Sequence, residues 1–96
     1  MIPDNDYKMA TLILEHSTQV QENENVMVQL IGLNGINLLR AIVEQLRNKG
    51  AHPFVQIEDT ETAKLLVQKG DDSFWSNQAK VDQLPKMKQM DVFIGI

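Results

Sequence analysis

The chain contains no cysteine. Disulfide bonds, thiolate metal ligands and cysteine nucleophiles are therefore excluded. It also contains no apolar run near the roughly 18 residues of a membrane span, so no membrane partner is expected. The first six residues show no basic segment followed by an apolar core, and a secretory signal is not predicted. Together these absences favour the cytoplasm and exclude cysteine-based redox chemistry.

Basic residues are also few. Nine Lys and Arg face thirteen Asp and Glu, for a net charge of -4. Nucleic acid binding needs clustered Lys and Arg, and the densest basic spot here, Lys86 and Lys88, fits a solvated helix face. No nucleic acid partner is predicted. The length of 96 residues and the hydrophobic fraction of 43% indicate one globular domain, 1-96, with a small core.

Two stretches place apolar residues at spacings of 0, 3, 4 and 7, which is the pattern of one helix face. The first predicts a helix from Tyr7 to Ser17. The second predicts a helix that begins at an Asn cap, either Asn34 or Asn37, and ends at Gly50. Gly supplies the left-handed residue that closes many helices, so this second boundary is well defined by the sequence.

Two further helices are expected after the second strand. Asp59 or Thr60 caps a helix over 61–69, and Ser73 caps a fourth helix, which Pro85 interrupts. Apolar and aromatic residues at helical spacing usually pack under a sheet, so we expect burial rather than a partner interface for those of the fourth helix. They are Phe74, Trp75, Val81, Leu84, Met87 and Met90.

Short runs rich in apolar and β-branched residues predict strands at 26–31, 53–57 and 91–96. Strands that alternate with helices imply right-handed crossovers and a parallel sheet. The sequence therefore predicts an α/β fold: a doubly wound parallel sheet of about three strands with flanking helices, of the Rossmann or flavodoxin-like kind. The strand orders 2-1-3 and 3-2-1 both satisfy the crossover rule.

The last predicted strand is a continuous apolar run, Val92 to Ile96. Such a run suits a parallel sheet that is covered on both faces and followed by another crossover helix. It predicts that the chain is the N-terminal part of a larger one. Because unpaired edges and an uncovered sheet face favour association, we expect a homo-oligomer.

A weak candidate site for a nucleotide or another anionic cofactor lies where doubly wound folds bind phosphate. It consists of Gly32, Asn34 and Gly35 after the first strand and Asp59 after the second. The turn lacks both the third glycine of G-x-G-x-x-G and the lysine of a P-loop. A structural turn, with Asp59 as a helix cap, is the favoured interpretation.

No catalytic or metal-binding residue is predicted. His16 and His52 each stand alone, whereas a metal site needs three or more converging ligands. The serines lack the G-x-S-x-G setting of a nucleophile elbow. No cofactor is therefore expected in this chain.

Several segments carry a resemblance to a known family. They are Tyr7 with Leu12, then 20–26, 38–41, 49–51 and 91–96. Over about residues 7–96 the chain resembles the N-terminal domain of the aminopeptidase T and aminopeptidase S family of metallopeptidases. Asn23 stands where the family usually has glycine, and Asn is the residue other than glycine that best accepts a left-handed conformation. The turn at 32–35 departs further, since family members more often carry a polar residue there.

The resemblance implies a parent enzyme that releases N-terminal amino acids from peptides. A pair of divalent metals in a C-terminal domain would polarise the scissile carbonyl and activate the attacking water. Peptide substrate would bind only to that full-length dimeric parent. This chain would be a scaffold without activity of its own. The alternatives are a free-standing nucleotide- or anion-binding module, or a protein-interaction domain that uses Phe74 and Trp75.

Overall fold

The computed structural model describes residues 2–96. Its elements are α1 (Asp4–Leu12), the π-helical turn η1 (Ile13–Ser17), β1 (Asn25–Ile31), α2 (Ile36–Asn48), β2 (His52–Glu58), α3 (Thr60–Lys69), α4 (Asp72–Gln78), the π-helical turn η2 (Ala79–Gln83), α5 (Leu84–Gln89) and β3 (Val92–Gly95). The three strands form one parallel sheet in the order β2-β1-β3. The predicted α/β fold is confirmed, and of the two possible strand orders the chain adopts 2-1-3.

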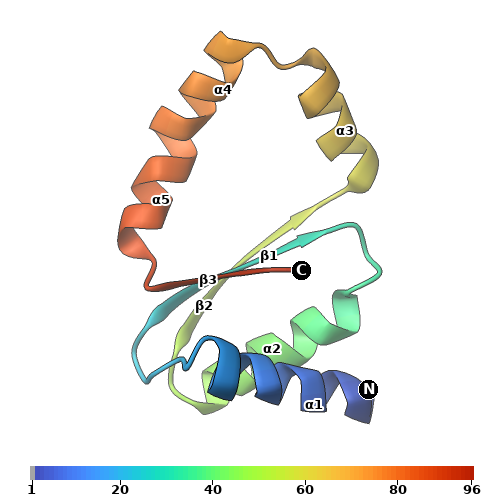
Figure 1. The fold of residues 1–96 in the computed structure, drawn as a ribbon, viewed down its shortest axis with the longest axis vertical. Coiled ribbons are helices and arrows are strands. Elements are labelled where there is room, and N and C mark those ends of the chain that lie inside the picture. The colour runs from blue at the N-terminus through green and yellow to red at the C-terminus, as the bar shows by residue number, and fades with distance from the viewer. Residues whose placement is uncertain (1) are drawn as a thin grey trace.

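The strand order places the helices on opposite sides of the sheet. The crossover through α2 leads from β1 to β2, whereas α3 to α5 lead back across β1 to β3. Crossovers of one hand that run in opposite directions put their helices on opposite faces. We call α1, η1, α2 and the sheet face they cover the base. We call residues 59–91 the arch, and the sheet face below it the open face (Figure 1).

The hydrophobic core lies in the base. Alternate residues of β1 point to it, and Val26, Val28 and Leu30 are almost completely buried. They meet buried residues of the base helices and of the loops beside them, joined by one residue of β3. These are Ala10, Leu14, Val20, Leu39, Ala41, Ile42, Leu46, Ala51 and Ile94. The alternate side chains of β1 that face the base and the apolar stripe of α2 thus bury each other.

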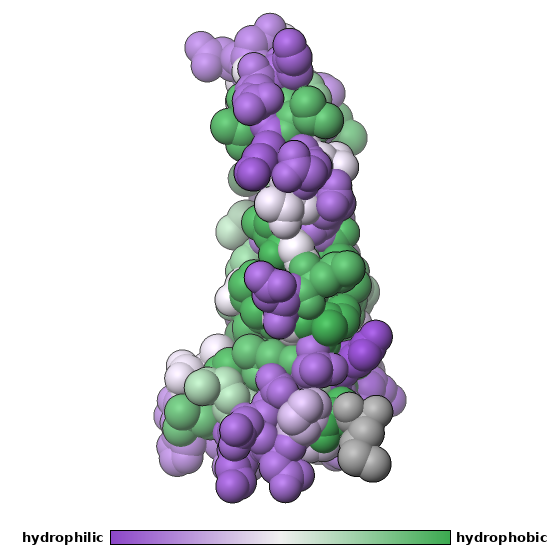
Figure 2. Space-filling view, turned by 90° about the vertical axis from the view of Figure 1, so that its right-hand side faces the viewer, coloured by the Kyte–Doolittle hydropathy of each residue, from purple (hydrophilic) through white to green (hydrophobic). Residues whose placement is uncertain are grey.

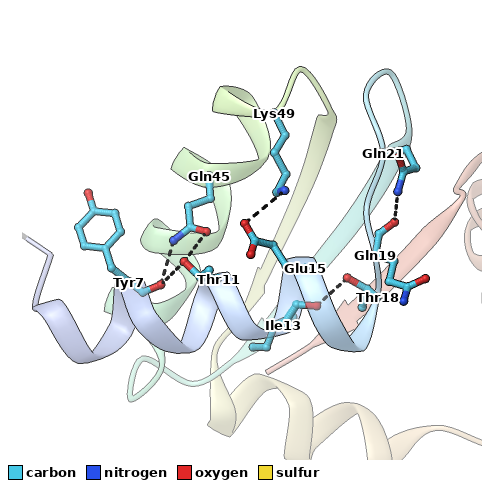
Figure 3. Close-up of polar contacts among 9 residues, drawn as sticks. All are labelled: Tyr7, Thr11, Ile13, Glu15, Thr18, Gln19, Gln21, Gln45 and Lys49. Atoms are coloured by element: carbon cyan, nitrogen blue, oxygen red, sulfur yellow. Dashed lines mark hydrogen bonds and ion pairs between the residues drawn. The ribbon is translucent and has the colours of Figure 1, made fainter.

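Polar contacts between side chains and backbone hold α1 against α2 beside this core (Figure 3). The Gln45 amide donates to the Tyr7 carbonyl at 2.9 Å, and the Thr11 hydroxyl donates to Gln45 Oε1 at 3.1 Å. Glu15 and Lys49 form a partly exposed ion pair at 3.8 Å. The Tyr7 hydroxyl donates to Glu44, and this hydrogen bond raises the pKa of Tyr7. The two helices are therefore held in one register along their contact.

Two helix boundaries in the base differ from the expected ones. Helix α1 begins at Asp4, three residues before Tyr7, where acidic residues of the first turn suit the positive end of the helix dipole. Helix α2 begins after Gly35, and no side chain of residues 2–96 caps it, so the predicted Asn cap is wrong.

The left-handed positions that the sequence indicated are confirmed. Gly50 has a φ of +81° and closes α2, while Asn23 has a φ of 67°. The Asn23 amide donates to the Gly50 carbonyl at 3.0 Å. One backbone contact thus joins the two turns that flank β1 and β2 at their amino ends.

The arch consists of two helical rods, the first formed by α3 and the second by α4, η2 and α5, and an aspartate caps the start of each. The Asp59 carboxylate accepts a hydrogen bond from the Thr62 amide at the start of α3, as predicted. The Asp71 carboxylate accepts from the Phe74 amide at 2.8 Å, so Ser73 is not the cap of α4. Asp71 rather than Ser73 caps α4 because its extended backbone, with ψ of -178°, places its carboxylate over the first free amides of the helix.

The second rod is continuous through Pro85. Helices α4 and α5 are joined by η2, whose wider turn ends just before the proline (Figure 1). Pro85 falls in the first turn of α5, where its missing N–H costs little. The predicted interruption is therefore wrong. The π-helical turn η2 accommodates the loss of the hydrogen bond that Pro85 cannot donate, and the helical rod continues.

The open face is far less covered than the apolar sequence of β3 predicts. In β3 only Ile94 is buried, and Phe93 remains 52% exposed. On the second rod Val81, Leu84 and Met87 are all more than half exposed. The expectation of a buried stripe on the fourth predicted helix is thus wrong, whereas an uncovered sheet face was expected for this chain. The arch is joined to the sheet at its two ends, and its helices stand away from the sheet between them (Figure 1).

Candidate functional site

A groove lies between the open face and the arch, with a volume of about 510 Å³. Its floor comes from the strands, and its walls come from α3 and the second rod. Its apolar lining includes Ile31, Leu66, Val67, Trp75, Met87 and Phe93. Ligand sites are typically mostly apolar hollows of this size with a few polar groups, so the groove is the leading candidate for a binding surface.

Polar groups in the groove form two separate pairs. On the floor, Gln29 and Gln56 are neighbours in the strand register, and Gln56 Nε2 donates to Glu58 Oε1 at 3.0 Å. On the wall, Lys86 Nζ lies 2.8 Å from Asp82 Oδ1, one helical turn away. Glu58 pairs with Gln56 on β2, and Lys86 pairs with Asp82 along the same helical rod. The groove thus presents amphipathic walls rather than one convergent set of reactive groups.

A smaller hollow of about 330 Å³ lies at the turn between α3 and α4, beside Gly70 and Phe74. Phe74 and Trp75 pack edge to face, with ring centroids 5.0 Å apart. The Trp75 ring also rests on Gly70, where an added Cβ would lie only 2.6 Å from its Nε1. Gly70 is therefore required for this close approach, which sets the corner of the arch.

The residues of the weak cofactor site come partly together. Gly32, with a φ of +78°, lies at the end of β1, and a Cβ there would meet the Thr60 hydroxyl at 2.8 Å. Gly32 and Asp59 thus lie at neighbouring strand ends. Gly35 lies apart from them, where a Cβ would meet Ile96 at 2.7 Å. Asn34 is exposed on the same turn.

The groups of this turn already have local roles. The Gly32 amide donates to the Glu58 carbonyl at 2.8 Å. The Asp59 carboxylate accepts from the amide and the hydroxyl of Thr62, both at 3.0 Å, and these hydrogen bonds lower its pKa. The two carboxylates here, those of Glu58 and Asp59, oppose an anionic ligand by Coulomb repulsion.

The two histidines lie on different elements. His16 on η1 and His52 at the start of β2 are both exposed. Within residues 2–96, no three metal-binding side chains lie close enough to share an ion. None of the helices in this range is both long and apolar enough to cross a membrane.

The sequence missed the groove because its members are spread over strands and helices far apart in the chain. Two signals pointed to it. Gln29 interrupts an apolar strand on the face that alternates away from the core, and Asp82 with Lys86 has the spacing of a helical ion pair. A scan against protein families and a search of curated proteins both found no match to the chain.

Proposed function

We propose that this chain is the N-terminal scaffold domain of a metal-dependent aminopeptidase of the aminopeptidase T and aminopeptidase S type, without activity alone. In that role the open face and the arch form one wall of a cavity that a second domain completes. Divalent metals and peptide substrate belong to the complete enzyme, which releases N-terminal amino acids. The family resemblance in the sequence is the source of this assignment.

The observation that supports a scaffold is the uncovered groove. Phe93 on the floor and Met87 on the wall are both more than half exposed, although each is large and apolar. Apolar patches of this kind usually mark a surface that another part of the assembly covers. A free-standing anion site is less well supported, because the Gly32 amide already has a partner and carboxylates flank it.

The first test is the reading frame beyond the codon for Ile96. The proposal expects it to continue for a domain or more with clustered Glu, His, Asp and Tyr that supply the metal site. An immediate stop codon would contradict it.

The second test is an assay of the 96-residue chain with an amino acid 4-nitroanilide and added zinc or cobalt. The proposal expects no hydrolysis above the rate with metal alone. Hydrolysis that rises in proportion to the amount of chain would refute the scaffold role. Phosphate titration adds a control: a higher melting temperature would favour the anion-binding module, because a ligand that binds only the folded state stabilises it.

A further inference from the structure

The turn between β1 and α2 contains the pair Asn34-Gly35, and the Asn34 side chain does not cap α2. An asparagine side chain can react with the backbone nitrogen of the next residue. Glycine at that position favours the reaction, because it has no side chain to block the approach and its backbone adopts more conformations. Every other asparagine of the chain is followed by a residue with a side chain. Asn34 is therefore the asparagine whose neighbour leaves this approach open.

The fold leaves this pair accessible. Asn34 is exposed, and Gly35 is only partly buried. Within residues 2–96 the Gly35 amide donates no hydrogen bond, whereas the amide that follows Asn48 donates to the Gln45 carbonyl at 3.0 Å. The turn lies at the right-hand side of Figure 1, and Figure 2 looks onto that side, where hydrophobic residues gather at mid-height between the hydrophilic base and the hydrophilic tip of the arch. Both reacting groups are thus unpaired, in a surface loop that water can reach.

We propose that Asn34 is a site of spontaneous modification, at which the chain converts to aspartate and isoaspartate through a cyclic succinimide. The Gly35 nitrogen attacks Cγ of Asn34 and forms a new C–N bond. The bond from Cγ to the side-chain nitrogen breaks, and that nitrogen leaves as ammonia with the proton of the Gly35 amide. One water then opens the ring. Cleavage at Cγ gives aspartate, whereas cleavage at the backbone carbonyl carbon gives isoaspartate, whose main chain runs through Cβ and Cγ.

Both products change the amino end of α2. Each adds a carboxylate, and α2 has neither an acidic residue in its first turn nor a side-chain cap within residues 2–96, so a negative charge suits its positive end. Isoaspartate also lengthens the main chain by one carbon directly before Gly35. An added Cβ on that glycine would lie only 2.7 Å from Ile96 and 3.1 Å from Leu30. A longer backbone in so close a fit disturbs the contact between this turn and the end of the sheet.

Incubation of the folded chain at neutral to mildly alkaline pH tests the proposal. Peptide mapping by tandem mass spectrometry with electron transfer, which distinguishes aspartate from isoaspartate, is expected to find both products at Asn34 ahead of every other asparagine. Asn34→Gln should lose this signal, because a glutamine side chain must close a larger ring. Asn37→Gln is the matched control in the first turn of α2, and it should react at Asn34 as the wild type does. Substitutions at such surface positions leave the fold nearly unchanged.

Two results would overturn the proposal. One is a folded chain that stays unmodified at Asn34, and reaction of the urea-unfolded chain would then show that the fold protects the pair. The other is modification spread equally over the asparagines.

The melting temperature measures the structural consequence. The isoaspartate form, separated from the unmodified chain, should melt at a lower temperature than Asn34→Asp, which carries the charge without the longer main chain. Equal melting temperatures would refute the disturbed contact with Ile96. The proposal concerns the chain itself and does not depend on the aminopeptidase role, which the reading frame tests separately.

Discussion

The base and the arch contain the same kinds of elements but differ in what holds them. In the base, helices α1 and α2 bury apolar faces against the sheet, and every core residue except Ile94 falls within residues 10–51. In the arch, none of the helical elements from α3 to α5 contains a buried residue. Short helices are marginal in water without tertiary packing. The comparison indicates that the base folds by packing, whereas the arch is held by local hydrogen bonds and by its connections.

The largest expected effect is on the core of the base. Ile42 is completely buried, and Ile42→Ala should lower the free energy of unfolding by about 2–5 kcal/mol through lost burial and a cavity. Val67 on α3 is 70% exposed, and Val67→Ala should change the stability by about 0.5 kcal/mol or less. Urea unfolding followed by circular dichroism measures both. Equal losses would remove the distinction between the two regions.

A smaller effect is expected at the corner of the arch. An added methyl group in Gly70→Ala would lie 2.6 Å from Trp75 Nε1 and 2.7 Å from the Leu66 carbonyl. The ring must move, at a cost of about 1–3 kcal/mol for overpacking. The chain has a single tryptophan, so its fluorescence maximum should shift to longer wavelength.

Gly95→Ala is the matched control for this change. At Gly95 the nearest atom to an added Cβ is 3.9 Å away, which is ordinary contact. The spectrum of this variant should match that of the wild type. An unshifted spectrum in Gly70→Ala would show that the Trp75 ring does not rest on that glycine in solution.

The smallest effect concerns the pH dependence of the arch. Hydrogen bonds from the amide and then the hydroxyl of Thr62 lower the pKa of Asp59 in the folded chain. A carboxyl with a lowered folded pKa stabilises the fold above its unfolded value of 3.8, and this stabilisation is lost as the pH falls through the folded pKa. The helicity of α3 should therefore decrease on acidification below that value.

Asp59→Asn separates the charge from the cap. Asn also caps helices but does not titrate, so this variant should lack the Asp59 part of the pH dependence while α3 stays helical at neutral pH. Circular dichroism across an acid titration makes the comparison. Identical curves for the wild type and Asp59→Asn would show that Asp59 does not stabilise the arch.

Local signals in the sequence were enough for much of the secondary structure. The apolar stripe of α2 predicted that helix, and Gly50 predicted its end, because both depend on residues within a few positions of each other. Where two local signals compete, the sequence misleads. Ser73 and Asp71 both suit a helix cap, and only the extended backbone at Asp71 decides between them. The continuity through Pro85 likewise depends on a turn type that composition does not reveal.

For the candidate site the sequence offered less. It placed Gly32 and Asp59 at neighbouring strand ends, since parallel strands share a direction. It did not reveal the groove, whose floor at Gln56 and wall at Lys86 are brought together only by the crossover. The periodicity of the second rod also suggested a buried stripe. Apolar periodicity identifies one face of a helix, but it does not determine whether that face packs against the sheet or stays exposed.

The sequence by itself determined the order of helices and strands, the parallel pairing and a cap of α3 at Asp59 or Thr60, because each follows from backbone sterics and hydrogen bonds over short distances. The tertiary structure alone decided the strand order β2-β1-β3 and the contrast between a packed base and an open arch. The reason is that burial depends on the path of a whole crossover over the sheet. The ends of the arch contact the sheet, where the Asn25 side chain donates to the Gln89 carbonyl and Thr60 lies beside Gly32, whereas large apolar residues between them, such as Val67 and Val81, stay exposed.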